Sequence, residues 1–91
     1  MIQCINFKPL ERGMLVGFGD FTVPKWGIEL LGCGVFRKGP AYWVMLPSRE
    51  WKNDEGETQY SPIVKFPVEE HQKAFRNLLK EAFLKYQAEN R

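Results

Sequence analysis

The chain has 91 residues, of which 44% are hydrophobic and 26% are charged. This length supports one domain with a modest core. Thirteen Lys and Arg residues against eleven Asp and Glu residues give a net charge of only +2, which excludes a strongly basic, histone-like protein. Any nucleic-acid site in such a chain must therefore be a local patch.

Short apolar and β-branched runs, separated by turn residues, predict an antiparallel meander in the first two thirds of the chain. Pro24 and Gly27 in one connection, and Gly39 and Pro40 in another, have turn chemistry. Pro47 ends the fourth run because proline cannot donate to a strand ladder. We expect strands at residues 2–8, 14–23, 28–36, 41–46 and 60–66, with a polar, mobile loop at residues 50–59.

The hydrophobic period changes after Pro67 and predicts a helix over residues 68–87. Glu69 and Glu70 lie in its first turn, where the helix dipole favours carboxylates. The apolar stripe of this helix is formed by Phe75, Leu78, Leu79, Ala82, Phe83 and Tyr86. The predicted fold is α+β: one domain over residues 1–91, with a curved antiparallel sheet of four or five strands followed by one long C-terminal helix.

The second predicted strand alternates between two faces. We assign the helix to the face that carries Gly17 and Gly19, because these two glycines leave room for the helix residues Phe75 and Phe83. The other face stays open to solvent, to a second subunit or to a ligand. The first face carries Leu15, Gly17, Gly19, Phe21 and Val23, and the second carries Val16, Phe18, Asp20 and Thr22.

The sequence contains no recognisable set of catalytic residues. Cys4, Cys33 and the single histidine, His71, form no metal-ligand set, and no nucleophile has a partner base at a recognisable spacing. We therefore expect no enzyme, no cofactor, no metal and no small-molecule substrate. The start of the chain has no leader pattern and no apolar run approaches the roughly 20 residues of a membrane span, so we expect a soluble, cytoplasmic protein with reduced thiols.

Aromatic rings alternate with cations in the predicted hairpins, which is typical of a surface for single-stranded nucleic acid. Trp26 follows Lys25 in a turn, and Trp51 lies between Arg49 and Lys52 in the long loop. Tryptophans in connections are exposed and often mark a contact surface. The candidate phosphate contacts are Lys25, Arg37, Lys38, Arg49, Lys52 and Lys65, and the candidate base-stacking residues are Trp26, Tyr42, Trp51 and Tyr60.

The same side chains are open to a second interpretation, in which they form a core and a protein–protein seam. The net charge near zero and the acidic segment at residues 54–57 favour this interpretation. It predicts an interaction or adaptor module of phage or bacterial origin that binds no nucleic acid. Trp43 fits either a core position or the open face.

The order of elements resembles the stage V sporulation protein G (SpoVG) family of small bacterial and prophage-encoded proteins over residues 2–84. The likeness rests on the strand at residues 13–23 and above all on residues 43–49, Trp-Val-Met-Leu-Pro-Ser-Arg, where the family has an aromatic–aliphatic run ending in Met-Pro-Ser and a basic residue. A polar loop, a strand ending near Pro67 and a helix follow in both. This chain departs from the family in having Leu46 before Pro47, a longer acidic loop and more aromatic residues.

The layout also looks like the dimeric fold of transcription coactivators and Whirly proteins, which bind single-stranded DNA. The resemblance implies a homodimer that binds single-stranded nucleic acid, DNA or RNA, with weak sequence preference, as an accessory factor in transcription or replication. Its contacts are the basic and aromatic residues of the sheet, and Arg49 matches the basic residue of the family motif. A fold analogy of this kind is an expectation about function and needs a site to support it.

Overall fold

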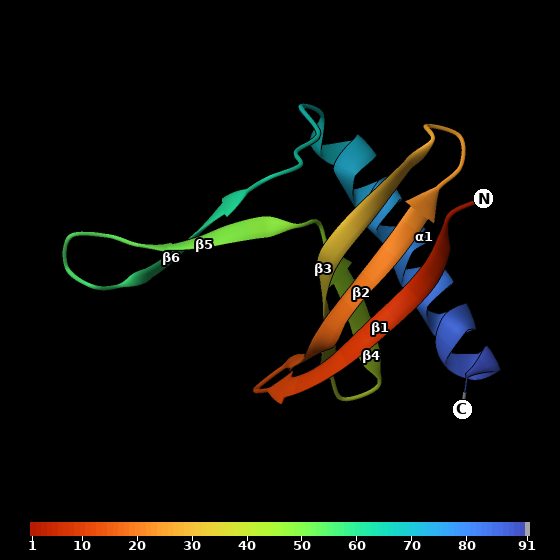
Figure 1. Cartoon of the computed structure of the whole chain (residues 1–91), viewed down its shortest axis with the longest axis horizontal. Coiled ribbons are helices and arrows are strands. Elements are labelled where there is room, and N and C mark those ends of the chain that lie inside the picture. The colour runs from red at the N-terminus through yellow and green to blue at the C-terminus, as the bar shows by residue number, and fades with distance from the viewer. Residues whose placement is uncertain (91) are drawn as a thin grey trace.

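Figure 1 shows a computed structural model of the chain, which describes residues 1–90. Four strands form an antiparallel sheet in the order β1-β2-β3-β4, and a separate hairpin of two strands and one long helix follow. The predicted α+β class, with a sheet that precedes a C-terminal helix, is confirmed. The elements are β1 (Gln3–Arg12), β2 (Leu15–Val23), β3 (Ile28–Lys38), β4 (Ala41–Met45), β5 (Ser48–Lys52), β6 (Thr58–Pro62) and α1 (Glu69–Glu89).

The prediction of a fifth sheet strand at residues 60–66 is wrong. Within the described residues β6 pairs only with β5, and the resulting hairpin projects away from the sheet along the longest dimension of the molecule, 43 Å (Figure 1). The loop between the two strands shrinks to residues 53–57, because Asn53 organises a tight turn there. Its Oδ1 accepts hydrogen bonds from the backbone N–H groups of Glu55 at 3.0 Å and Glu57 at 2.9 Å.

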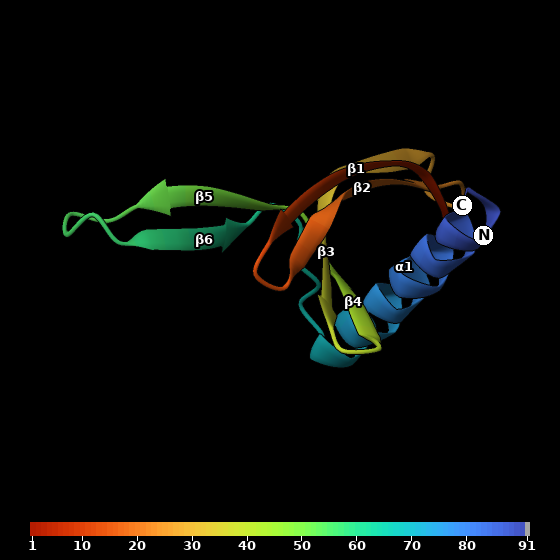
Figure 2. The same ribbon diagram turned by 90° about the horizontal axis from the view of Figure 1, so that it is seen from below.

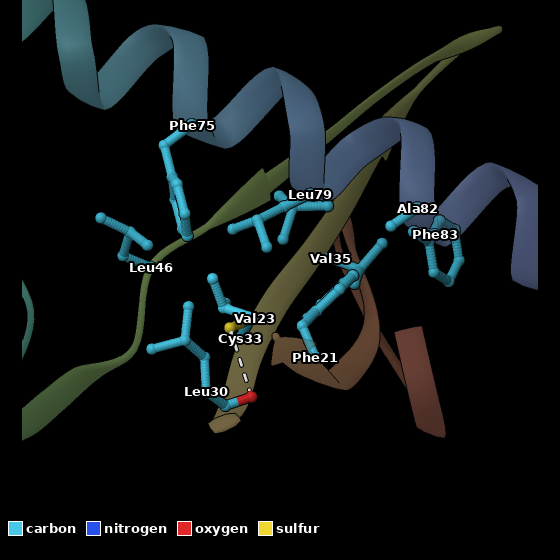
Figure 3. Packing of buried hydrophobic residues seen from close by; sticks show 11 residues of the cluster. Phe21, Val23, Leu30, Cys33, Val35, Leu46, Phe75, Leu79, Ala82 and Phe83 are labelled. Atoms are coloured by element: carbon cyan, nitrogen blue, oxygen red, sulfur yellow. Dashed lines mark hydrogen bonds between the residues drawn. The ribbon is translucent and has the colours of Figure 1, made fainter. Parts of the chain in front are cut away.

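The core lies between the inner face of the sheet, defined as the face toward α1, and the helix (Figures 2 and 3). Four residues of the predicted helical stripe are buried in it: Phe75, Leu79, Ala82 and Phe83. Leu78, assigned to the same stripe, is 49% exposed because it lies at the edge of the buried face. The sheet contributes Phe21, Val23, Leu30, Cys33, Val35, Val44 and Leu46.

Gly17 and Gly19 lie on the inner face as predicted, but the space above them is filled from the sheet itself. A Cβ atom on Gly17 would lie 2.6 Å from the ring of Phe7, and one on Gly19 would lie 2.9 Å from the ring of Phe21. Phe7 in turn packs against Phe83 with ring centroids 5.0 Å apart. The glycines therefore admit two sheet phenylalanines, which meet the helix in place of direct backbone contact.

β-Bulges interrupt the simple alternation of β2. One lies between Leu15 and Gly17, so that Leu15 pairs with Phe36 on the outer face while Val16 packs against the core. These two residues are thus exchanged relative to the predicted pattern. Bulges increase local bending and twist, and Figure 2 shows the sheet arching over α1.

Among residues 1–90, no helix or strand covers the outer, convex face of the sheet. It carries Phe18, Phe36, Trp43 and Met45, none of which belongs to the core. Phe36 and Trp43 are paired across β3 and β4, and their rings stack with centroids 5.6 Å apart and an angle of 7° between the planes. The open second face predicted from the sequence is therefore present, with an aromatic pair on it.

Candidate nucleic-acid interface

The ten predicted contact residues do not form one surface. Lys25 and Trp26 lie in the β2–β3 turn, and Lys65 lies between β6 and α1. Arg37 and Lys38 end β3 and Tyr42 belongs to β4, at the far end of the sheet. The hairpin carries the remaining four, Arg49, Trp51, Lys52 and Tyr60.

Trp26 closes one end of the core. Its indole stacks on Phe75 with ring centroids 5.3 Å apart and planes at 7°, and it lies 6.3 Å from the ring of Phe66. Half of its surface, 50%, remains exposed. It lines an apolar groove of 630 Å³ beside Leu78 and Lys85. Trp26 is thus a partly structural residue, with one ring face committed to the helix.

The hairpin displays its predicted residues on two opposite faces. Arg49 and Trp51 share one face, and Lys52 and Tyr60 share the other, because side chains alternate along a strand. The Trp51 Nε1–H group donates a hydrogen bond to Ser61 Oγ at 2.8 Å, which fixes the indole along the ribbon. Two cations stand against four carboxylates between residues 48 and 62, so the hairpin as a whole carries a charge of −2. This negative net charge is unfavourable for binding phosphate groups.

Arg37 and Tyr42 form a pair across β3 and β4. Arg37 Nη1 donates to Tyr42 Oη at 3.4 Å, and the guanidinium carbon lies 5.8 Å from the ring centroid. The hydrogen bond to Tyr42 raises the pKa of Arg37, a guanidinium that is charged at neutral pH in any case. The ring of Tyr42 also packs 5.8 Å from that of Phe83, so the pair is anchored to the helix.

A groove of 460 Å³ runs between β4 and α1, and we call it the edge groove. β4 forms an edge of the sheet and pairs only with β3 among the described residues, so its outer side is open to the groove. The groove is lined by residues 42–45 of β4 and by Lys73, Arg76, Asn77 and Lys80 of α1.

The edge groove is basic because three cations recur on one side of the helix. Lys73, Arg76 and Lys80 are spaced by three and four residues, which places them on the same helical face over about 10 Å. Arg76 Nη1 lies 3.3 Å from Met45 Sδ and so reaches across to β4. Lys73 Nζ lies 3.7 Å from Glu69 Oε1. An exposed ion pair of this kind contributes little to stability.

Trp43 connects the edge groove to the outer face. It lines the groove together with the cations of α1, and its indole stacks on Phe36 on the outer face of the sheet. Trp43 and three positively charged residues therefore line the same groove. Arg37, through Tyr42, adds a fourth charge at the β3–β4 end.

The sequence prediction missed the three helix cations, and it left Trp43 undecided between core and open face. The signal was present in the spacing of Lys73, Arg76 and Lys80. A charged row on a helix is usually a solvated face, however, and only the position of the row beside a sheet edge makes it part of a groove.

The cysteines, the histidine and the acidic residues do not gather into a second site within residues 1–90. No group of three or more His, Cys, Asp or Glu residues in the described part of the chain is arranged to hold a metal ion. Burial raises the pKa of the Cys33 thiol to about 12, and it raises that of Cys4 as well. His71 is exposed on the first turns of α1.

No protein-family model, curated protein or solved structure matches this chain. The likeness to SpoVG and to the coactivator and Whirly proteins therefore stays a prediction from short motifs and element order. Within residues 1–90, no helix combines the length and the apolar character that crossing a membrane requires.

Proposed function

We propose that the protein binds single-stranded nucleic acid, DNA in the first instance, along the edge groove. The observation that carries the proposal is that Trp43, whose indole stacks on Phe36, lines the same groove as a row of cations. Phosphates lie against Lys73, Arg76 and Lys80, and a base stacks beside Trp43. Stacking of this kind contributes on the order of 1–3 kcal/mol per base and tolerates any base, which fits weak sequence preference.

The edge groove differs from the site expected from the sequence, but it includes some of the predicted contact residues. Arg37 and Tyr42 extend the groove toward the β3–β4 turn, where Lys38 adds a further cation. The resemblance to SpoVG and to single-stranded-DNA-binding coactivators supports the same function. Four of the predicted contacts lie on the acidic hairpin, and we give them no part in this site: Arg49, Trp51, Lys52 and Tyr60.

The proposal is tested by titrating a labelled oligothymidine at several salt concentrations. Three or four neutralised phosphates predict that log K falls with log[salt] with a slope between about −2 and −3, from the single-strand value of about −0.7 per phosphate. Lys80→Gln lowers the magnitude of this slope, whereas Lys85→Gln, on the part of α1 that lines the apolar groove, leaves it unchanged. Absence of binding at low salt refutes the proposal.

A protein–protein interaction module is the second candidate function. The specific observation in its favour is the hairpin, which carries a charge of −2 and exposes Trp51 and Tyr60 away from the core. Under this alternative Trp51→Ala changes association with a protein partner. Under the first proposal the same substitution leaves oligothymidine affinity unchanged.

A further inference from the structure

The hairpin of β5 and β6 lacks support from the rest of the described chain. Its base is closed by a hydrogen bond from the Ile63 N–H group to the Pro47 carbonyl oxygen at 3.0 Å, and beyond this point the ribbon extends away from the sheet and helix (Figures 1 and 2). Trp51 remains 42% exposed and Tyr60 67% exposed. An isolated two-stranded hairpin is marginally stable in water, so contact with a partner would stabilise this one.

The tip of the hairpin presents three exposed carboxylates on an ordered turn. Asp54, Glu55 and Glu57 are exposed around a turn that Asn53 holds with backbone and side-chain hydrogen bonds. Since the hairpin carries −2 and the whole chain +2, the remainder of the chain carries +4. The charge of the molecule is thus divided between an acidic arm and a basic body.

The edge groove is the part of the body that complements this tip. It offers Lys73, Arg76 and Lys80 within about 10 Å along the helix, and its 460 Å³ admits several side chains. The tip of the same chain does not enter it, because the hairpin points away from α1 (Figure 1). Complementary charges on one molecule that do not meet within it favour contact between two copies.

We infer that the acidic hairpin tip of one copy occupies the edge groove of a second copy and competes there with nucleic acid. The carboxylates of Asp54, Glu55 and Glu57 take the places of phosphates beside the three cations. Self-association and nucleic-acid binding therefore exclude one another at each groove. The competition rests on the proposed function, whereas the contact between copies does not.

The contact between copies is tested by exchanging the charges. We expect sedimentation velocity at low salt to show self-association of the unaltered protein, and this association to weaken as salt rises because the charge pairs are exposed. A tip variant, Asp54→Lys with Glu55→Lys and Glu57→Lys, is monomeric, as is a groove variant, Lys73→Glu with Arg76→Glu and Lys80→Glu. Mixing the two variants restores a complex, because each now carries the complement of the other.

A matched control is Glu81→Lys with Lys85→Glu, which alters charges beside the apolar groove and preserves self-association. Circular dichroism establishes that each variant is folded. The inference is overturned if the unaltered protein stays monomeric at low salt, if either charge variant still self-associates, or if the mixture forms no complex.

The competition is tested separately by titrating oligothymidine into a neutral-tip variant, Asp54→Asn with Glu55→Gln and Glu57→Gln. This variant binds the oligonucleotide more tightly than the unaltered protein at protein concentrations where the latter self-associates. Oligothymidine also dissociates the self-associated form. If no variant binds oligothymidine, the proposed function fails while sedimentation still decides the contact. If binding occurs and the tip has no effect on it, the competition is wrong.

Discussion

Asp20 Oδ1 accepts a hydrogen bond from the backbone N–H of Gly32 at 2.9 Å, which joins the middle of β2 to the bulge in β3. The second oxygen, Oδ2, accepts from Asn6 Nδ2 at 3.4 Å, beside a bulge in β1. One carboxylate on β2 therefore links irregularities in the two strands that flank it. Gly32 has φ +74, and its bulge contributes to the bending of the sheet over α1.

We predict that Asp20→Ala lowers the free energy of unfolding by about 1–2 kcal/mol. The reason is that the N–H group of Gly32, which lies in the β3 bulge, loses its hydrogen-bond acceptor. Asp20→Asn keeps an acceptor and costs less. Urea unfolding monitored by tryptophan fluorescence measures both. Equal losses in the two variants contradict the assigned role of the hydrogen bond.

Gly17→Ala is predicted to destabilise the protein more than Gly19→Ala. A Cβ atom at position 17 lies 2.5 Å from the Lys8 carbonyl oxygen, which is backbone and cannot move without disturbing β1. At position 19 the nearest atom is 2.9 Å away on the ring of Phe21, which can shift. Overpacking costs about 1–3 kcal/mol, and thermal unfolding of the pair shows whether Gly17→Ala lies at the upper end.

Cys33 is predicted to make stability fall at alkaline pH. Its pKa is raised by burial from 9.0 to about 12 in the folded protein. Between these values the folded state retains a proton that the unfolded state has lost, so the free energy of unfolding decreases as pH rises. The slope from this thiol is at most about 1.4 kcal/mol per pH unit.

The contribution of Cys33 is isolated by comparing Cys33→Ala with the unaltered protein in urea unfolding from pH 8 upward. The difference in stability between the two narrows as pH rises through this range. Parallel curves rule out the assigned linkage. A thiol reagent provides a second measurement, because Cys33 is fully buried and stays unmodified until the protein unfolds.

Two tryptophans provide a matched pair for the nucleic-acid proposal. Trp43→Ala weakens oligothymidine binding by about 1–3 kcal/mol because the stacking ring is lost from the edge groove. Trp51→Ala leaves affinity unchanged, since Trp51 lies on the acidic hairpin. Fluorescence anisotropy measures both affinities. The reverse order of effects places the site on the hairpin instead.

Amide hydrogen exchange is predicted to separate the hairpin from the sheet. Amides of β5 and β6 in a dilute, high-salt sample exchange much faster than those of β2 and β3, which are paired on both sides and cover the core. At low salt and high protein concentration, protection rises at the tip around Asn53. Protection of the hairpin that is high and independent of concentration contradicts a supporting contact from a second copy.

The sheet and helix were predictable because local signals agreed with the tertiary outcome. Pro24 with Gly27, and Gly39 with Pro40, mark turns wherever the chain reverses between β2, β3 and β4. The spacing of Phe75, Leu79 and Phe83 identifies the buried side of α1 before any partner is known. Each of these features depends on residues close together in the chain.

The hairpin and the site were less predictable because they depend on choices between distant partners. Residues 48–52 are all exposed and highly polar, so nothing local distinguishes a strand from a loop. Whether β6 joins β5 or the sheet is a matter of pairing over the whole fold. The bulge at Val16 exchanges two faces without a sequence signal, and the helix cations become a groove only through the placement of β4.

The hydrogen bond between Pro47 and Ile63 has a consequence for engineering. Because the Ile63 N–H group lies 3.0 Å from the Pro47 carbonyl oxygen, residues 48–62 enter and leave the body at one point. We therefore expect this stretch to be replaceable. A shorter reverse turn, a fluorophore-bearing peptide or another hairpin inserted between Pro47 and Ile63 leaves the four-stranded sheet and the helix folded.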